Sequence, residues 1–158
     1  MAAELVGALR NHEDAISTRQ LENGLVSDDV LTEVRSSLEA VGFDVEQGKR
    51  ADEKIHRPVL FGENGEPELQ YQVDGYHPEH RCGIEIEAGR AWDGNAIYRD
   101  LIHAAMMVQV DTLALVVPNA YKHSRGTTPA FEKTKRVAET LYRTDRFDLP
   151  YDLVLVGY

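Results

Sequence analysis

The spacing of apolar residues along the chain alternates between a helical period and a strand period. The clearest helix is expected between Ser27, a residue type that often caps helices, and Gly42, a residue type that often ends them. Its apolar positions recur at intervals of three or four residues: Val30, Val34, Leu38 and Val41. Further helices are expected over three segments: 2–22, 91–108 and a stretch that starts at Pro129. Asp93 and Thr128 are the expected caps of the last two. The inward face of the segment 91–108 is expected to carry Ile97, Leu101, Ala104, Ala105 and Val108.

Strands are expected where apolar and polar residues alternate, and where apolar residues are continuous. Three such segments, two of them joined through the strong turn signal Asn64-Gly65, are expected to form an antiparallel meander: 59–61, 68–73 and 81–88. Two continuously apolar segments each follow a helix, which favours parallel pairing: 112–117 and 151–156. Two polar stretches are expected to be loops: 49–57 and 119–128. The pattern predicts one α/β domain over residues 1–158, with a mixed sheet flanked by helices.

Three carboxylates are expected to meet where two neighbouring strands lie side by side. Glu85 and Glu87 are two residues apart, so in a strand they project from the same face, opposite Ile84 and Ile86. Asp74 ends the preceding apolar run and is expected to lie alongside them. Clustered carboxylates repel one another and are costly to desolvate unless a cation neutralises them. Because oxygen ligands suit hard divalent ions, this cluster predicts a Mg2+ (or Mn2+) site.

The same residues carry a family resemblance. The pattern D-x10-E-x-E at Asp74, Glu85 and Glu87 is followed by A-G-R-A-W-D-G-N-A-I-Y-R-D-L, a polar turn and a helix start. This arrangement resembles the restriction-endonuclease-like nucleases of the PD-(D/E)XK superfamily, as an architecture over residues 28–118 and in detail over residues 84–101. Glu87 stands where most members have Lys, and this E-x-E form is similar to the type II restriction enzymes of the BamHI and BglII kind.

The resemblance implies a restriction-endonuclease-like fold, in which an antiparallel meander is followed by a parallel strand. It also implies metal-dependent hydrolysis of DNA phosphodiester bonds, in which a cation neutralises phosphate oxygens and activates water. The implied metal ligands are Asp74, Glu85 and the backbone carbonyl of Ile86. Glu87 would accept the proton of the attacking water or hold a second ion. An outer carboxylate is implied on the helix after Ser27, where the spacing does not choose between Glu33 and Glu39.

Several basic or amide side chains are candidates for contacting nucleic acid. Three of them follow the acidic strand and would contact phosphate or brace the carboxylates: Arg90, Asn95 and Arg99. For Arg99 and Asp100, a helix ion pair of the i, i+4 type or simple surface exposure is the alternative. Two more lie in an aromatic and basic loop, where a solvated surface is the alternative: Lys122 and Arg125. The resemblance further implies DNA as the partner and a homodimer, because two sites then address two strands.

Composition limits the setting of the protein. The chain of 158 residues has a net charge of −10, which argues against a general nucleic-acid coat protein. Its single cysteine, Cys82, excludes an intramolecular disulfide and suggests a reducing compartment. No apolar run is long enough to span a membrane, and the first residues lack the pattern of a signal peptide. A cytoplasmic protein is therefore expected.

Two other interpretations fit the same pattern. The first is a catalytically inactive relative with the same fold, acting as a nucleic-acid-binding or protein-assembly module. The acidic charge and the absence of Lys at position 87 favour this interpretation, whereas the three retained acids oppose it. The second is an unrelated small α/β domain in which D-x10-E-x-E is incidental. A structure with the three side chains on different faces would establish that second interpretation.

Overall fold

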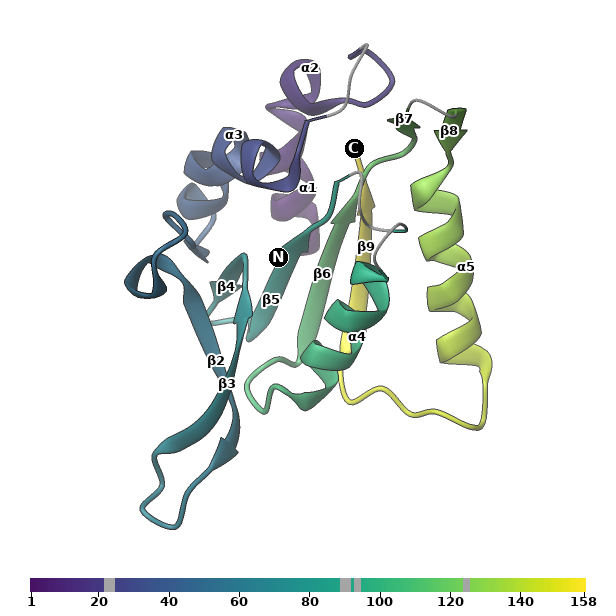
Figure 1. The fold of residues 1–158 in the computed structure, drawn as a ribbon. Coiled ribbons are helices and arrows are strands. Elements are labelled where there is room, and N and C mark those ends of the chain that lie inside the picture. Colours follow the sequence, from purple (N-terminus) through teal and green to yellow (C-terminus); the bar gives the residue numbers. More distant parts are fainter. Residues whose placement is uncertain (22–24, 89–91, 93–94, 124–125) are drawn as a thin grey trace.

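A mixed sheet lies at the centre of the protein. The computed structural model describes residues 1–21, 25–88, 92, 95–123 and 126–158. Five strands pair in the spatial order β1 (Asp44–Val45), β4 (Gly75–His77), β5 (Cys82–Ile86), β6 (Thr112–Val117) and β9 (Asp152–Gly157) (Figure 1). β4 is antiparallel to β1 and to β5, whereas β5, β6 and β9 run parallel. The expected α/β architecture with a mixed sheet is confirmed.

Helices cover both faces of this sheet, so the fold has three layers (Figure 1). One face is covered by α1 (Ala2–Arg10), the single turn α2 (Glu13–Ile16) and α3 (Ser27–Ala40). The other face is covered by α4 (Ala96–Met106) and α5 (Ala130–Arg143). In the described part of the chain, no helix is long and apolar enough to cross a membrane.

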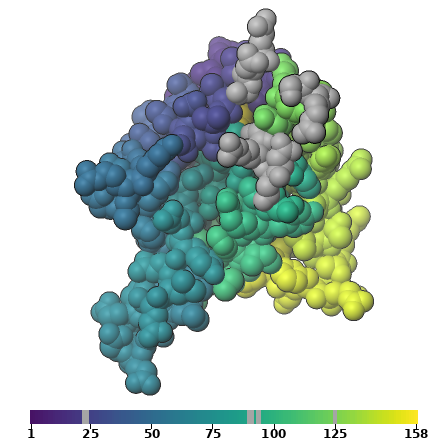
Figure 2. All heavy atoms as spheres, viewed as in Figure 1, coloured from purple at the N-terminus to yellow at the C-terminus, as the bar shows by residue number. Residues whose placement is uncertain are grey.

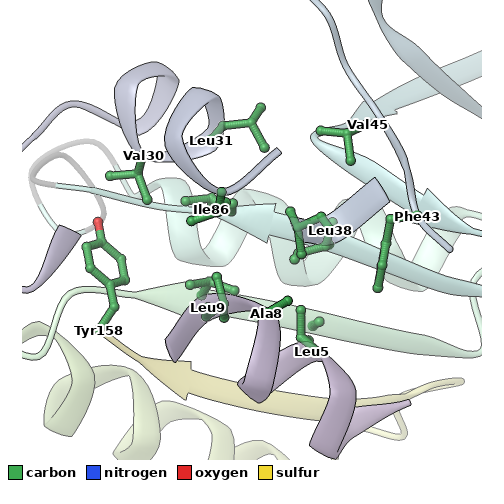
Figure 3. Packing of buried hydrophobic residues seen from close by; sticks show 14 of the residues in the cluster. Leu5, Ala8, Leu9, Val30, Leu31, Leu38, Phe43, Val45, Ile86 and Tyr158 are labelled. Carbon is green, nitrogen blue, oxygen red and sulfur yellow. The ribbon is translucent and has the colours of Figure 1, made fainter. Parts of the chain in front are cut away.

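Alternation along the central strands assigns side chains to these two layers. Ile84 and Ile86 of β5 pack with Leu5 and Leu9 of α1 and Val30 of α3 (Figure 3). The residues of β6 divide in the same way: Ala114 and Val116 join this cluster, whereas Leu113 and Leu115 pack under α4. Because Glu85 lies between two isoleucines that face α1 and α3, its side chain points to the α4 side of the sheet.

The hairpin expected around Asn64-Gly65 is present but does not belong to the central sheet. Its strands β2 (Ile55–Phe61) and β3 (Pro67–Val73) pair only with each other among the described strands. The turn has Gly65 at φ +80, as the sequence signal requires. The tip of the hairpin extends away from the body of the molecule (Figure 2). The expected three-stranded meander is therefore corrected: the strand that pairs with β5 is β4, which follows a bend at Asp74.

Several element boundaries also differ from the expectation. The segment 2–22 forms the separate helices α1 and α2, and the helix expected over 91–108 runs from Ala96 to Met106. Because that helix ends before Val108, this side chain is 52% exposed rather than inward. The expected loops contain a 3-10 turn η1 (Ala51–Glu53) and a short hairpin of β7 (Tyr121–His123) and β8 (Gly126–Thr128).

The expected caps are corrected as well. Val26 precedes α3, and Ser27 is its first helical residue, whose Oγ accepts a hydrogen bond from the Ala88 amide at 3.2 Å. Thr128 ends β8, so the cap position of α5 is Pro129. Asn95 occupies the cap position of α4, and the expected cap, Asp93, lies outside the described residues.

Gly75 allows the strands beside the acidic cluster to approach closely. A Cβ atom at this position would lie 2.9 Å from the Asp44 carbonyl oxygen and 2.9 Å from Cγ2 of Ile84. We therefore expect Gly75→Ala to lower the free energy of unfolding by about 1–3 kcal/mol, measured by urea denaturation. The matched control is Gly7→Ala in α1, where a Cβ meets nothing within 4 Å and helix propensity favours Ala. Equal stability of Gly75→Ala and the wild type would contradict the close packing.

Candidate active site

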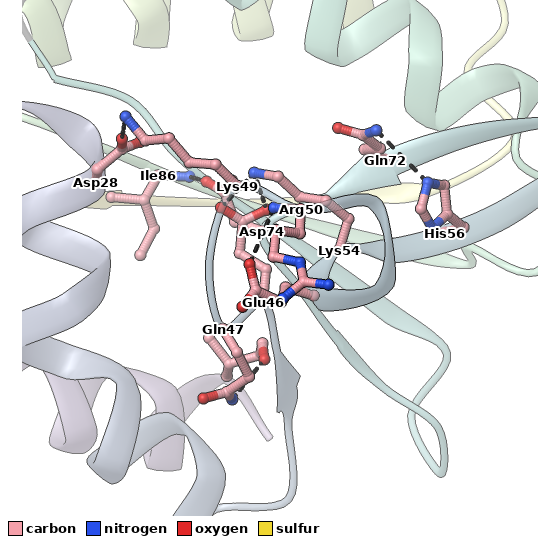
Figure 4. A network of polar contacts seen from close by, with 12 residues as sticks. Asp28, Glu46, Gln47, Lys49, Arg50, Lys54, His56, Gln72, Asp74 and Ile86 are labelled. Carbon is pink, nitrogen blue, oxygen red and sulfur yellow. Dashed lines mark hydrogen bonds and ion pairs between the residues drawn. The ribbon is translucent and has the colours of Figure 1, made fainter.

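Strand register brings Asp74 and Glu85 together. In the antiparallel pair β4–β5, Gly75 lies opposite Ile84 and Tyr76 opposite Gly83. Continuing this register by one residue places Asp74 opposite Glu85, and side chains of directly opposed residues share one face of a sheet. Oδ2 of Asp74 accepts a hydrogen bond from the Ile86 amide at 2.7 Å, which ties the bend to β5 (Figure 4). The two expected metal ligands are therefore neighbours.

Both carboxylates open into a cleft of about 400 Å³ between the hairpin and α4. Four acidic side chains line this cleft: Glu46, Asp74, Glu85 and Asp100. Three basic or titratable nitrogen groups face them: Lys54, Arg99 and His103. The remaining wall is formed by residues 70–73 of β3. The cleft thus has more carboxylates than permanent positive charges, and the excess negative charge has to be neutralised by protons or by a bound cation.

Electrostatics within the cleft favours the protonated form of the acids. Burial raises the pKa of Asp74 from 3.8 to about 7, with the hydrogen bond from the Ile86 amide opposing the shift and the charge of Glu46 adding to it. The pKa of Glu85 is also raised well above its ordinary value, first by burial and then by the charge of Asp74. When a cation binds to a carboxyl group with such a pKa, the group releases its proton and the cation takes the place of that proton.

Glu87 lies beside the cleft in a small network with α4. Nη2 of Arg99 donates to Oε1 of Glu87 at 3.3 Å, and Nε of Arg99 donates to Oδ1 of Asp100 at 2.9 Å. The pKa of Glu87 is raised to about 8, first by burial and then by the hydrogen bond and the charge of Asp100, while the charge of Arg99 opposes the shift. The carbonyl of Glu87 accepts from the hydroxyl of Tyr158 at 3.0 Å, which holds the end of the acidic strand.

Lys54 and Glu46 form a buried ion pair at the cleft that the sequence pattern does not predict. Nζ of Lys54 donates to both carboxylate oxygens of Glu46, at 2.8 and 2.7 Å, and both side chains are largely buried (Figure 4). Lys54 follows η1, whereas Glu46 follows β1. The sequence places Lys54 in a polar loop and offers no motif for Glu46, because only the fold brings the two segments beside Asp74.

Asp100 is the second acid of the cleft, after Glu46, that does not belong to the D-x10-E-x-E pattern. Its side chain is 2% exposed, although it belongs to a helix that begins near the surface. A signal was present in the sequence: position 100 lies on the same helical face as Ile97, Leu101 and Ala104, which are all buried. An aspartate on an apolar face is uncommon and marks a site with a specific polar surrounding.

The remaining expected site residues that the structure describes are not among the residues that line the cleft. Glu33 pairs with His12 at 3.0 Å and Glu39 accepts from Gln47 at 2.8 Å, and neither side chain lines the cleft. Glu46 is an acid beside Asp74 that does line the cleft. Asn95 is exposed at the start of α4, and Lys122 donates to the Leu21 carbonyl outside the cleft. Arg90 and Arg125 lie outside the described residues.

The donor chemistry of the cleft suits a hard divalent cation. Within the described ranges, no group of three or more His, Cys, Asp or Glu side chains is arranged to hold a metal ion as it stands. The donors are nevertheless carboxylate oxygens, which Mg2+ and Mn2+ prefer. In addition, Oδ2 of Asp100 is buried and has no hydrogen-bond partner among the described residues. An orphaned buried carboxylate oxygen at the cleft fits the presence of a cation. Asp74 and Glu85, whose carboxylates open into the same cleft, are the candidates to hold that cation.

Comparison with known proteins identified no significant relative of the chain. No family model matches the chain, and neither the curated proteins nor the solved structures include a significant match to it. The case for a function therefore depends on the geometry and chemistry of the cleft.

Proposed function

We propose that this protein is a metal-dependent DNA endonuclease with a restriction-endonuclease-like fold. The observation that carries the proposal is the juxtaposition of Asp74 and Glu85, which come from adjacent strands and open into one cleft. The order of elements around them supports the proposed fold: the helix α3 comes first, then the antiparallel pair β4–β5, then α4 and the parallel strand β6. The register argues against an incidental D-x10-E-x-E pattern, because it places these two acids on one face.

In the proposed reaction, Asp74 and Glu85 hold a Mg2+ or Mn2+ ion, and the carbonyl of Ile86 is the third predicted ligand. Such an ion, when bound, neutralises charge on the phosphate and lowers the pKa of water. Glu87 accepts the proton of the attacking water, a task that suits a carboxyl with a pKa of about 8. Arg99 holds Glu87 in place through its ion pair and is 57% exposed, so it is accessible to a phosphate.

Lys54 supplies the positive charge that position 87 lacks. Its amino group lines the same cleft as Asp74 and Glu85, and Glu46 fixes its position. An ammonium group next to the scissile phosphate stabilises the negative charge that develops there. In this proposal, the lysine that most related nucleases carry on the acidic strand is replaced by a lysine from the start of the hairpin.

Removing the charge of Lys54 is expected to slow plasmid cleavage by about a hundredfold. Because Lys54→Met alone leaves Glu46 buried without its partner, the informative variant is Glu46→Gln/Lys54→Met, which removes both charges together. Lys49→Met is the control, since Lys49 forms an exposed pair with Asp28. Mn2+ binding by the double variant, measured by calorimetry, should persist, which separates loss of catalysis from loss of the site. Unchanged cleavage by the double variant would remove Lys54 from the mechanism.

The proposed substrate is DNA, and the proposed active form is a homodimer. Two sites related by a twofold axis address the two strands of a duplex. The experiment that tests the function is incubation of supercoiled plasmid with the wild-type protein and Mg2+ or Mn2+, with EDTA as the negative control. Cleavage that depends on the metal supports the proposal, and linear product formed without accumulation of nicked circles supports the dimer. A protein that binds Mn2+ but leaves all DNA intact would contradict the endonuclease.

A non-catalytic module of the same fold is the second candidate. The observation that favours it is Glu87, a carboxylate at the position where most nucleases of the proposed superfamily have a catalytic lysine. Glu87 forms an ion pair with Arg99. Such a module would bind nucleic acid or another protein without cleavage. It is distinguished by binding of labelled DNA without cleavage, when the same preparation is tested with each metal ion.

A further inference from the structure

Asp100 has one carboxylate oxygen in use and one without a partner. Oδ1 accepts a hydrogen bond from Nε of Arg99 at 2.9 Å and forms an ion pair with Nη2 of the same guanidinium, also at 2.9 Å. Oδ2 is buried and has no hydrogen-bond partner in the described part of the chain. The side chain is 2% exposed and lines the cleft together with Asp74 and Glu85. Arg99 therefore satisfies one side of this carboxylate and leaves the other side directed at the acidic cluster.

A buried oxygen in this state is unfavourable unless a proton donor or a cation reaches it. Leaving a buried polar atom unsatisfied costs about 1–3 kcal/mol, and more for a charged group. The groups close to Asp100 are acids: its charge contributes to the raised pKa values of Asp74, Glu85 and Glu87, and protonated Glu87 also donates a hydrogen bond to it. Once Glu87 loses this proton, as it does above its raised pKa, the carboxylates around Asp100 offer it no donor. Asp100 is thus close to each of the three carboxylates of the D-x10-E-x-E pattern, and a cation among them would satisfy all four groups at once.

We propose that Asp100 is a carboxylate ligand of the divalent cation held by Asp74 and Glu85, with Oδ2 as its ligating atom. The inference rests on the proposed function for the presence of that cation. It deepens that function by adding a ligand from α4 to the two from the bend and from β5. Arg99 then has a second task, because it orients Asp100 through Oδ1 while Oδ2 stays available.

The first test is a calorimetric titration with Mn2+ at pH 8, without DNA. Asp100→Asn keeps the shape of the side chain and an acceptor for Arg99 but removes the charge. We expect its dissociation constant for Mn2+ to rise at least about tenfold relative to the wild type, because a charged ligand is lost. Asp111→Asn is the control, since Asp111 forms an exposed pair with Arg81 and should bind Mn2+ like the wild type. Equal Mn2+ affinity of Asp100→Asn and the wild type would overturn the inference.

A second test uses only the wild-type chain, so it does not depend on how the variant folds. Fe2+ with ascorbate and hydrogen peroxide produces hydroxyl radicals that cut a protein backbone close to the bound metal. We expect cuts near residues 74, 85 and 100, all suppressed by excess Mg2+. Cuts near residues 74 and 85 without one near residue 100 would overturn the role of Asp100.

Failure of this inference can be told apart from failure of the proposed function. Weaker Mn2+ binding by Asp100→Asn, together with a wild type that cleaves no DNA, would support the ligand and reject the endonuclease. Metal-dependent cleavage by the wild type, with unchanged Mn2+ binding by Asp100→Asn, would support the endonuclease and reject the ligand. A wild-type chain that binds no divalent cation would overturn both.

Discussion

Glu85→Gln is expected to reduce metal-dependent cleavage of plasmid DNA by about a thousandfold, which corresponds to about 4 kcal/mol of transition-state stabilisation. The substitution preserves the size of the side chain and removes the charge that holds the cation. Asp74→Asn should have a similar effect, because Asp74 lies opposite Glu85 in the strand register. The measurement is the initial rate of supercoiled plasmid loss with Mg2+ at a fixed protein concentration.

The matched control for this prediction is Glu79→Gln, the same chemical change in the exposed turn between β4 and β5. Its cleavage rate should equal that of the wild type. Glu85→Gln is expected to fold, because it removes one negative charge from a cluster in which burial and like charges already favour the neutral acid. Full activity in both Glu85→Gln and Asp74→Asn would mean that the catalytic centre lies elsewhere.

Without divalent cations, the protein is expected to lose stability as the pH rises from about 4 to about 8. The folded state raises the pKa of Asp74 from 3.8 to about 7 and that of Glu87 from 4.5 to about 8. In this interval the folded chain keeps protons that the unfolded chain has released, so the free energy of unfolding falls with increasing pH. The contribution is complete below pH 4 and is lost above pH 8, with a total of several kcal/mol.

Urea denaturation at pH 5 and pH 8 in EDTA measures this loss. Asp74→Asn should show a smaller difference between the two pH values, because an amide does not ionise, and it should exceed the wild type in stability at pH 8. Adding Mn2+ at pH 8 should restore stability to the wild type and less to Asp74→Asn. Equal pH dependence in the wild type and Asp74→Asn would argue against an acidic cluster that is strained without a cation.

Most secondary structure was predictable because it depends on neighbours in the sequence. The helical spacing of Val30, Val34 and Leu38 predicts α3, and all three side chains are buried. Strand alternation correctly places Glu85 on the face opposite Ile84 and Ile86. The hairpin was harder to place, since Asn64-Gly65 specifies a turn but not the sheet that its strands join.

For the candidate site too, local patterns predicted one part and the tertiary structure decided the rest. The sequence alone determined Asp74 and Glu85 as neighbours, because a period of two and a short turn are local properties of strands. It also determined the mixed α/β architecture through the order of its elements. Only the tertiary structure decided that Glu46, Lys54 and Asp100 share their cleft, because these residues come from segments that no local pattern joins. The raised pKa values of Asp74 and Glu87 were decided there too, since burial and like charges act through space rather than along the chain.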